Sequence, residues 1–189
     1  ENAELIKKKY NEAIKNGTLQ KGDTWTGNIM GVIASTRGNT NHIFGADSTN
    51  AATQTQTNLA GRKCVLRLLK FFKTIPGGEK ASINKMMNET ASRETYRIKG
   101  ETMITVHDYT SGRVFEDALS YSFYPIDLHD EKGVVPRHLK HGTVPTIPRG
   151  ALIPMGSKNI MVAGRSVSSD RLANSAARVQ ASSMGMGQA

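Results

Sequence analysis

The sequence has little of several features that would assign a protein to a class at once. Cys64 is the one cysteine, which excludes an intramolecular disulfide and a metal site built from cysteines. Aromatic residues make up 6% of the chain, and no window approaches the ~18 uninterrupted apolar residues that a membrane span requires. The first residues, ENAELIKKKY, have neither an initiator methionine nor the apolar core of a signal peptide. We therefore expect no membrane span, and the sequence indicates no compartment.

Acidic residues are the minority, because 16 Asp and Glu stand against 25 Lys and Arg and give a formal net charge of +9. Such an excess raises the question of nucleic acid. The basic residues are spread along the chain, however, and we expect no stretch that interleaves them with exposed aromatic residues. This pattern is typical of a solvated surface, so we expect no nucleic-acid partner.

The 189 residues, 38% of them apolar, suit one domain or one domain plus part of another. The pattern indicates helices at 2–16, 58–75 and 168–189, a helical piece at 80–90, and strands at 24–36, 95–108 and 159–164. Between them we expect a polar loop at 37–57, a turn and short helix at 109–123, and extended chain at 124–154. Too few strands and helices alternate along the chain for a complete doubly wound sheet. We therefore expect an α+β fold, a mixed sheet with flanking helices, that ends in one strand-helix unit.

The sequence indicates three structural roles. Gly17 lies where a glycine commonly follows a helix C-terminus, and Ser169 or Asp170 is the expected N-cap of the last helix. Cys64 falls within a helix of core character, so we expect a small buried hydrophobic side chain rather than a reactive thiol.

The stretch NIMVAGRSVSSD, residues 159–170, combines an apolar run with a glycine turn and a helix start. Gly164 permits a tight turn or the close approach of backbone to a ligand. A helix that opens just beyond offers free N–H groups and a positive dipole end, which favour a phosphate or another anion. Arg165, at the carboxyl end of the expected strand, points toward the crevice where open α/β sheets bind ligands. From these residues alone, the stretch is either an ordinary strand-to-helix turn or a ligand site.

Five segments in order resemble the FAD-dependent oxidoreductase family of bacteria. They are ASRETYRIKGE (91–101), SGRVFEDAL (111–119), YPIDLHD (124–130), IPRGALIPMGSKNIMVAGR (147–165) and NIMVAGRSVSSDRLANSAARVQASSMGMGQA (159–189). The resemblance runs from about Gly61 to Ala189 and implies a fold similar to two-domain flavoproteins of the glutathione-reductase type. Departures from the family pattern lie at Tyr96, Ser166, Gln180, Ala181 and Ser183.

The resemblance implies a division into two parts. Residues 1–150 would be an α+β substrate domain, and residues 151–189 the returning strand and helix of a Rossmann-like FAD-binding domain. The family's Gly-x-Gly-x-x-Gly phosphate loop is absent from this chain, and GMGQA follows a helix pattern and does not replace it. We therefore expect a fragment that is inactive alone, that needs an N-terminal FAD-domain segment as its partner, and that self-associates through apolar surface.

The resemblance implies FAD as the cofactor and four residues near it. Gly164 and Arg165, with Ser168 next in line, would approach the ribityl or pyrophosphate region. Arg178 would place its guanidinium near the isoalloxazine ring or the phosphates, where a cation stabilises the reduced flavin anion. The alternative for Arg178 is a surface salt bridge.

His129 in YPIDLHD is the expected proton-transfer residue. An oxidoreductase that acts on an alcohol or amine needs a base as hydride leaves for the flavin, and imidazole titrates in the useful range. Asp127 and Asp130 flank it and would orient the ring or raise its pKa. The alternative is a histidine that hydrogen-bonds a loop carbonyl. His138 and His141 are three residues apart without a third ligand, so we predict no metal site.

Arg93 and Arg97 are four apart, and in a regular strand both would lie on one face. They form a candidate clamp for the carboxylate of a small-molecule substrate, since arginine binds carboxylates in a fork. A structural network with Glu94 or Glu101 is the alternative. A non-enzymatic module that binds an anion or a sugar through Arg93, Arg97 and the 37–57 loop is the competing function.

Overall fold

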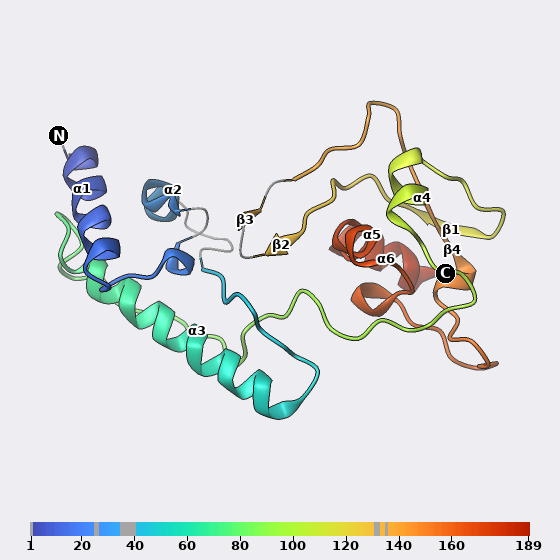
Figure 1. The fold of residues 1–189 in the computed structure, drawn as a ribbon, viewed down its shortest axis with the longest axis horizontal. Helices are drawn as coiled ribbons and strands as arrows, with labels where there is room; N and C mark the ends of the chain where they lie inside the picture. The colour runs from blue at the N-terminus through green and yellow to red at the C-terminus, as the bar shows by residue number, and fades with distance from the viewer. Residues whose placement is uncertain (1, 25–26, 35–40, 131–132, 135) are drawn as a thin grey trace. The chain divides into compact units, whose positions relative to one another are not determined.

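The computed structural model describes residues 2–189 apart from 25–26, 35–40, 131–132 and 135. The chain divides into two compact units, Glu1–Ser92 and Arg93–Ala189 (Figure 1). The described residues form six α-helices and short antiparallel strand pairs. The predicted α+β class is therefore confirmed, whereas the assignment of 1–150 and 151–189 to a substrate domain and a flavin domain stays a prediction.

The first unit is helical. It contains α1 (Asn2–Lys15), a 3-10 turn η1 (Lys21–Asp23), α2 (Ile29–Ala34) and the long α3 (Ala51–Phe72). The helices predicted at 2–16 and 58–75 are confirmed. Gly17, with φ of +78°, follows α1 in the left-handed conformation that glycine adopts without strain.

The core of this unit is an apolar cluster between α1 and α3. Its buried members are Ile6, Tyr10, Ala13, Leu19, Ile29, Leu68, Phe71 and Ile75. One buried ion pair ties η1 to α3, because Arg67 Nε and Nη2 donate to Asp23 Oδ2 and Oδ1 at 2.7 and 2.6 Å. Burial alone would raise the pKa of Asp23, but the hydrogen bonds from Arg67 outweigh it and lower the pKa.

Two predictions for this unit are wrong, and a third is wrong in part. The strand expected at 24–36 is helix α2 over Ile29–Ala34, while residues 25–26 and 35–36 lie outside the described ones. The side-chain oxygen of Asn28 accepts from Gly31 N–H at 3.0 Å, so the first turn of α2 is capped locally and no strand partner is needed. No helix forms at 80–90, where the chain instead packs on α3 and Thr90 N–H donates to Asn58 Oδ1 at 2.8 Å.

The polar loop predicted at 37–57 is correct for residues 41–50 and wrong beyond them; residues 37–40 lie outside the described ones. Helix α3 begins at Ala51 because Asn50 is its N-cap and accepts from Thr53 N–H at 3.0 Å. Thr55 and Thr57 then donate their hydroxyls to the carbonyls of Ala51 and Thr53. These hydrogen bonds explain how a Thr-rich segment is accommodated in a helix.

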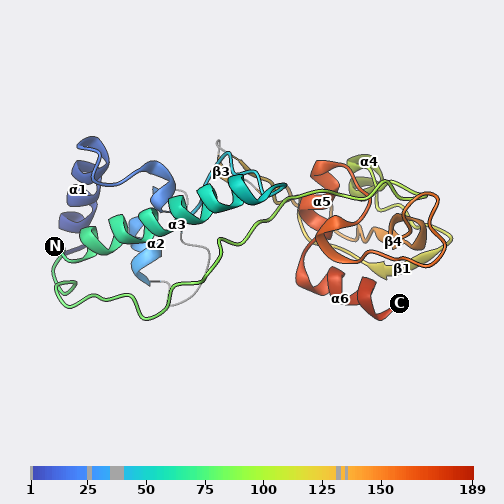
Figure 2. The same cartoon turned by 90° about the horizontal axis from the view of Figure 1, so that it is seen from below.

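The second unit consists of short elements around one core. In order they are α4 (Val106–Ser111), β1 (Ala118–Tyr121), β2 (His129–Asp130), β3 (Gly133–Val134), β4 (Thr146–Pro148), η3 (Arg149–Ala151), η4 (Gly164–Ser166), α5 (Arg171–Ala177) and α6 (Gln180–Gln188). Strand β1 pairs antiparallel with β4, and β2 pairs antiparallel with β3. Figure 2 shows α6 beside the β1–β4 pair.

The core of this unit joins apolar residues from nearly every element to a buried hydroxyl cluster. The buried apolar residues are Ile104, Tyr109, Ile126, Ile147, Ala151, Leu152, Val167, Ala173, Ala176, Ala177 and Met186. Tyr109 Oη lies 2.7 Å from Ser122 Oγ, which also accepts from Ser182 Oγ at 2.9 Å. The cluster links α4, the end of β1 and α6, and it satisfies polar groups that would otherwise be costly to bury.

Predictions for residues 95–123 are largely wrong. Instead of strands at 95–108, the chain makes isolated bridges at Gly100 and Ile104 and enters α4 at Val106. Gly100 approaches its neighbours so closely that a Cβ there would lie 2.9 Å from the Gly150 carbonyl oxygen. The short helix expected within 109–123 is a turn followed by β1, whose partner β4 lies about 25 residues further along the sequence and could not be identified locally.

The strand predicted at 159–164 is also wrong. Ile160 and Met161 are 59% and 51% exposed, and no described strand pairs with them. Val162 N–H donates to the Leu152 carbonyl at 2.8 Å, which leaves this stretch as irregular chain. An apolar run becomes a buried strand when neighbouring strands cover it, and the second unit supplies none at this position.

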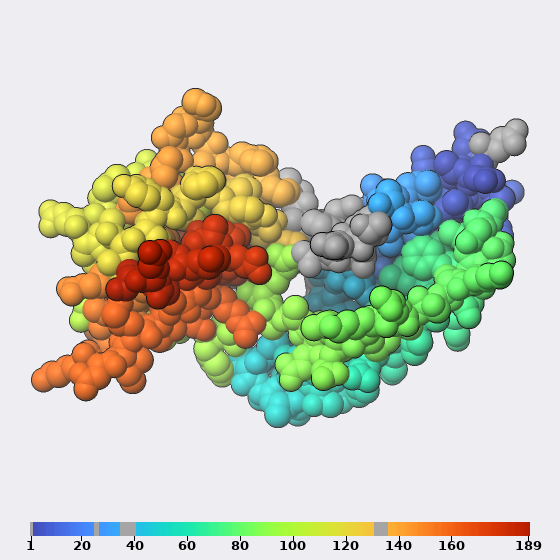
Figure 3. All heavy atoms as spheres, turned by 180° about the vertical axis from the view of Figure 1, so that it is seen from behind, coloured from blue at the N-terminus to red at the C-terminus, as the bar shows by residue number. Residues whose placement is uncertain are grey.

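The C-terminal helix is confirmed, with Asp170 as its N-cap, although it is interrupted after Ala177. Asp170 Oδ1 accepts from Ala173 N–H at 2.8 Å, and Oδ2 accepts from Val106 N–H at the start of α4. One carboxylate therefore fixes the starts of two helices. The space-filling view shows α5 and α6, in red, packed against yellow and orange segments of the same unit (Figure 3).

Candidate functional site

Asp127 and His129 form a buried pair in the second unit. His129 Nε2 lies 3.1 Å from Asp127 Oδ2, and the two side chains are 7% and 11% exposed. Asp127 is fixed from two sides, because its N–H donates to Ser175 Oγ on α5 and the preceding Ile126 exchanges backbone hydrogen bonds with Arg137. A carboxylate only accepts hydrogen bonds, so this contact places a hydrogen on Nε2 of the histidine.

Two arginines converge on the same aspartate. Arg93 Nη1 lies 3.7 Å from Asp127 Oδ2, and Arg178 Nη2 donates to the Asp127 main-chain carbonyl at 3.3 Å. Arg178 follows the last residue of α5, so the helix end directs its side chain. Its Nε is buried and has no hydrogen-bond partner among the described residues. We call Arg93, Asp127, His129 and Arg178 the Asp127 cluster.

The electrostatics of the Asp127 cluster favour a neutral histidine. Burial lowers the pKa of His129, and the positive charges of Arg93 and Arg178 lower it further, while Asp127 acts in the opposite direction. Burial and the charge of Arg93 also lower the pKa of Arg178, although a guanidinium stays protonated in proteins. Near neutral pH the cluster therefore contains two guanidiniums, one carboxylate and an uncharged imidazole.

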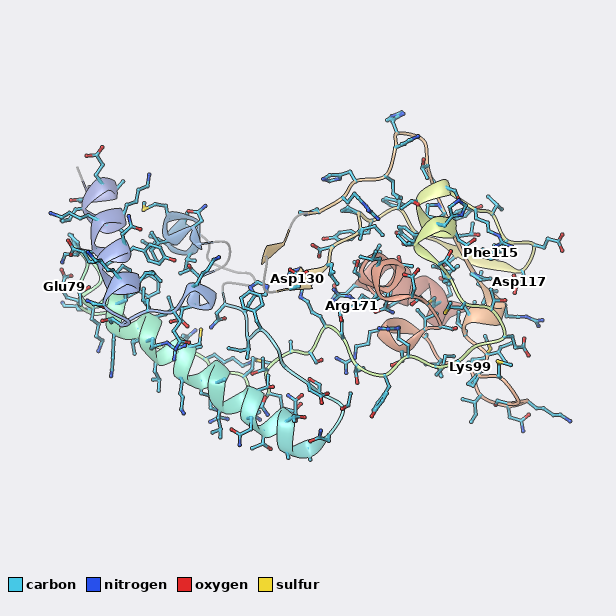
Figure 4. All side chains as sticks on the ribbon, in the orientation of Figure 1. Glu79, Lys99, Phe115, Asp117, Asp130 and Arg171 are labelled. Atoms are coloured by element: carbon cyan, nitrogen blue, oxygen red, sulfur yellow. The ribbon has the colours of Figure 1, made fainter. Side chains whose placement is uncertain are left out.

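A second ion pair borders the Asp127 cluster. Arg171 Nε donates to Glu94 Oε2 at 2.8 Å, with the arginine side chain 53% exposed. Figure 4 shows Arg171 beside the α5 helix, on which it is the first residue. Glu94 is thus engaged by Arg171, while its sequence neighbour Arg93 is engaged by Asp127.

The predicted flavin turn is a 3-10 turn rather than the link between a strand and a helix. Gly164 has φ of +85°, and a Cβ there would lie 3.8 Å from Ser183 Oγ, so backbone conformation and not space requires glycine. Arg165 is exposed, and its carbonyl accepts from Asn174 Nδ2 at 3.1 Å. Ser168 is 2% exposed, and its N–H and carbonyl are bonded to Ala151 and Ile104.

The structure brings together three of the predicted site residues: Arg93, His129 and Arg178. Arg97 is not among them and forms no ion pair with a described residue. Arg93 and Arg97 do not share the face of a strand as predicted, because the chain is not a strand there. Sequence reasoning missed the contribution of Ser175, whose hydroxyl bonds the main chain of Asp127. No local signal identifies it, since serine in a helix is common.

Other kinds of site find no support in the part of the chain that the structure describes. No described helix has the length and apolar character needed to cross a membrane. No group of three or more His, Cys, Asp or Glu side chains is arranged there to hold a metal ion.

One comparison with known proteins identifies a relationship. A family model described as FAD dependent oxidoreductase matches residues 2–189, which is almost the whole chain. Searches of curated proteins and of solved structures find no significant match.

Proposed function

The chain belongs to the FAD-dependent oxidoreductase family, and from that membership we propose that the protein transfers a hydride between a small organic substrate and FAD. The family implies FAD as the cofactor, and FAD supplies two-electron redox chemistry when it is bound. The observation that carries the assignment of residues is the buried Asp127–His129 pair with its two arginines.

The residues of the second unit fit a flavin in two respects. Arg178 retains a buried N–H donor with no described partner, which is an unusual feature in a folded protein and suits an acceptor from a bound group. Gly164 forms a tight turn with φ of +85°, and the adjoining Arg165 is exposed. We assign flavin contacts to Gly164 and Arg165, and we place Arg178 beside the flavin, where its charge acts on the flavin while its Nε–H is open to an acceptor on a bound group. Ser168 is the weaker assignment, because its side chain is buried and its backbone groups are already bonded.

His129 is the proposed base. The neutral ring carries a hydrogen on Nε2 toward Asp127 and a lone pair on Nδ1, so Nδ1 accepts the proton of a substrate hydroxyl or amine. Asp127 then faces an imidazolium, whose positive charge it stabilises through the same contact. In this reaction the substrate loses one proton to His129 and one hydride, and a carbonyl or imine forms.

The phosphate loop of the family has no counterpart in this sequence, so we propose that it comes from a segment outside residues 1–189. On this proposal the 189-residue chain binds FAD weakly and does not turn over. The test uses a protein extended by the residues encoded before Glu1, in which flavin absorbance is measured after purification and after adding FAD. Colourless protein that stays inactive with FAD would refute the function.

Two sets of variants test the assigned residues in the extended protein. Arg165→Ala and Arg178→Ala should lower flavin occupancy or shift the flavin potential, with exposed Arg149→Ala as the matched control. Unchanged occupancy and potential in both would contradict the flavin assignment. His129→Gln should lower the rate of flavin reduction by about 10²–10⁴-fold without lowering occupancy, the usual contribution of a general base.

The competing anion- or sugar-binding module gains no specific support. Arg93 forms an ion pair with Asp127 rather than acting with Arg97, and residues 51–57 of the supposed binding loop are part of α3.

A further inference from the structure

The two arginines of the Asp127 cluster are incompletely paired. Arg93 Nη1 lies 3.7 Å from Asp127 Oδ2, which is longer than a hydrogen bond, and the same oxygen is 3.1 Å from His129 Nε2. Arg178 reaches the Asp127 carbonyl with Nη2 at 3.3 Å, and its buried Nε has no described partner. The Asp127 carboxylate therefore faces His129 and Arg93, the Asp127 carbonyl accepts from Arg178, and the Arg178 Nε donor has no partner among the described residues.

Positive charge is also concentrated around these donors. Burial and the charge of Arg93 both lower the pKa of Arg178. A buried donor without an acceptor is costly, and an anion that accepts from both arginines would remove this cost and offset the repulsion between the two guanidiniums.

We propose that Arg93 and Arg178 form a subsite for the carboxylate group of the substrate. The inference rests on the proposed function and narrows its substrate to a small hydroxy acid or amino acid. A carboxylate has two oxygens that each accept a charge-assisted hydrogen bond, and Arg178 Nε and the Arg93 guanidinium supply one donor each. The carboxylate approaches from the side of Arg93, whose side chain is 34% exposed, and the substrate hydroxyl or amine then lies toward His129.

This subsite differs from the sequence-based prediction in one residue. Arg178 replaces Arg97 as the partner of Arg93, although it is 85 residues away in the sequence. The exchange occurs because the end of α5 and residue 93 both reach Asp127.

The test follows the side-chain Nε–H signals of arginine by nuclear magnetic resonance in the 189-residue chain. Glycolate is the probe, since it carries a carboxylate beside a hydroxyl, and glycolamide is its uncharged control. We expect saturable shifts of the Arg178 Nε–H and the His129 ring signals with glycolate, and none with glycolamide or with chloride at equal ionic strength. Equal responses to glycolate and chloride, or no saturable response to glycolate, would overturn the subsite.

Variants separate this site from general surface charge. Arg178→Gln should weaken glycolate binding by about tenfold or more, the loss expected for a charge-assisted hydrogen bond. Arg93→Gln should act in the same direction, and because Arg93 is partly exposed it keeps the proposal testable if Arg178→Gln fails to fold. Exposed Arg149→Gln is the control of equal charge change. A loss of affinity as large in Arg149→Gln would overturn the proposal.

A parallel titration with FAD distinguishes the two anions that could occupy Arg178. If FAD alone shifts the Arg178 Nε–H and prevents glycolate from binding, the site belongs to the flavin and the carboxylate subsite is wrong. If glycolate binds but the extended, flavin-loaded protein transfers no hydride from any hydroxy or amino acid, the subsite stands and the proposed function fails.

Discussion

Cys64 lies on α3 and is fully buried, at 0% exposure. Burial raises the pKa of its thiol to about 12, and its hydrogen bond to the Asp23 carboxylate adds to the effect. Asn41 Nδ2 donates to the sulfur at 3.3 Å. The hydrogen bond from Asn41 acts in the opposite direction, but burial and Asp23 outweigh it and favour the thiol over the reactive thiolate, as expected for a structural cysteine.

We therefore predict that Cys64 in the native chain reacts with a disulfide reagent far more slowly than in urea. At high reagent concentration the reaction rate should reach a plateau. The plateau is set by how fast the first unit opens, so adding more reagent should not raise the rate further. The control is Cys64→Ser combined with Lys80→Cys, since Lys80 is exposed. If Cys64 in the folded chain reacted as fast as the cysteine at position 80 of the control variant, the burial of Cys64 would be contradicted.

His129 gives the second prediction at the scale of a residue. Its pKa in the fold lies below 6.5, its ordinary value, so the unfolded chain binds the proton more tightly than the native state. Acid therefore favours unfolding. The free energy of unfolding should fall as the pH drops below about 6.5 and stop responding to His129 below its native pKa.

Urea unfolding of the second unit at a series of pH values measures this dependence. His129→Gln should flatten the slope between pH 6.5 and the region where carboxylates titrate, while exposed His138→Gln should retain it. A slope that survives His129→Gln would show that another group is responsible.

At the scale of elements, the starts of α4 and α5 are held together by one residue. Asp170 caps α5 through Ala173 N–H and also accepts from Val106 N–H in α4. Neither helix is long, since α4 has 6 residues and α5 has 7. Helices this short are not stable alone and depend on caps and packing.

Asp170→Ala should lower the free energy of unfolding of the second unit by about 1–3 kcal/mol, because it removes a cap and leaves two N–H groups unpaired. Amide hydrogen exchange should increase at the starts of both α4 and α5. Glu116→Ala, at an exposed position, should change stability by less than about 0.5 kcal/mol. Loss of protection in α5 alone would show that the contact to Val106 adds nothing.

The exposed apolar surface of the second unit matters at the scale of the whole molecule. Val114, Phe123 and Met184 are 73%, 73% and 74% exposed, and the Ile160–Met161 stretch is also open to solvent. Large apolar side chains at such exposure favour association. We propose that the 189-residue chain self-associates through this unit.

Light scattering over a range of concentrations should show a mass that rises above that of a monomer. Replacing Val114, Phe123 and Met184 together by serine should reduce the association, whereas Met87→Ser, at a position 68% exposed in the first unit, should not. A monomer at all concentrations would contradict the proposal.

The sequence by itself determined the features that depend on neighbours along the chain. The helical period predicted α1 and most of α3, Gly17 marked the end of α1, and Asp170 was a candidate N-cap because its side chain reaches N–H groups three residues away. Ordered motifs also indicated the family that the family model then matched.

The tertiary structure decided what depends on residues distant in sequence. The 159–164 stretch is apolar enough for a strand, yet it is irregular because no described strand covers it. Arg178 rather than Arg97 joins Arg93, because chain packing and not spacing brings α5 to Asp127. The lowered pKa of His129 likewise arises from burial and from charges supplied by residues 36 and 49 positions away, which no local pattern contains.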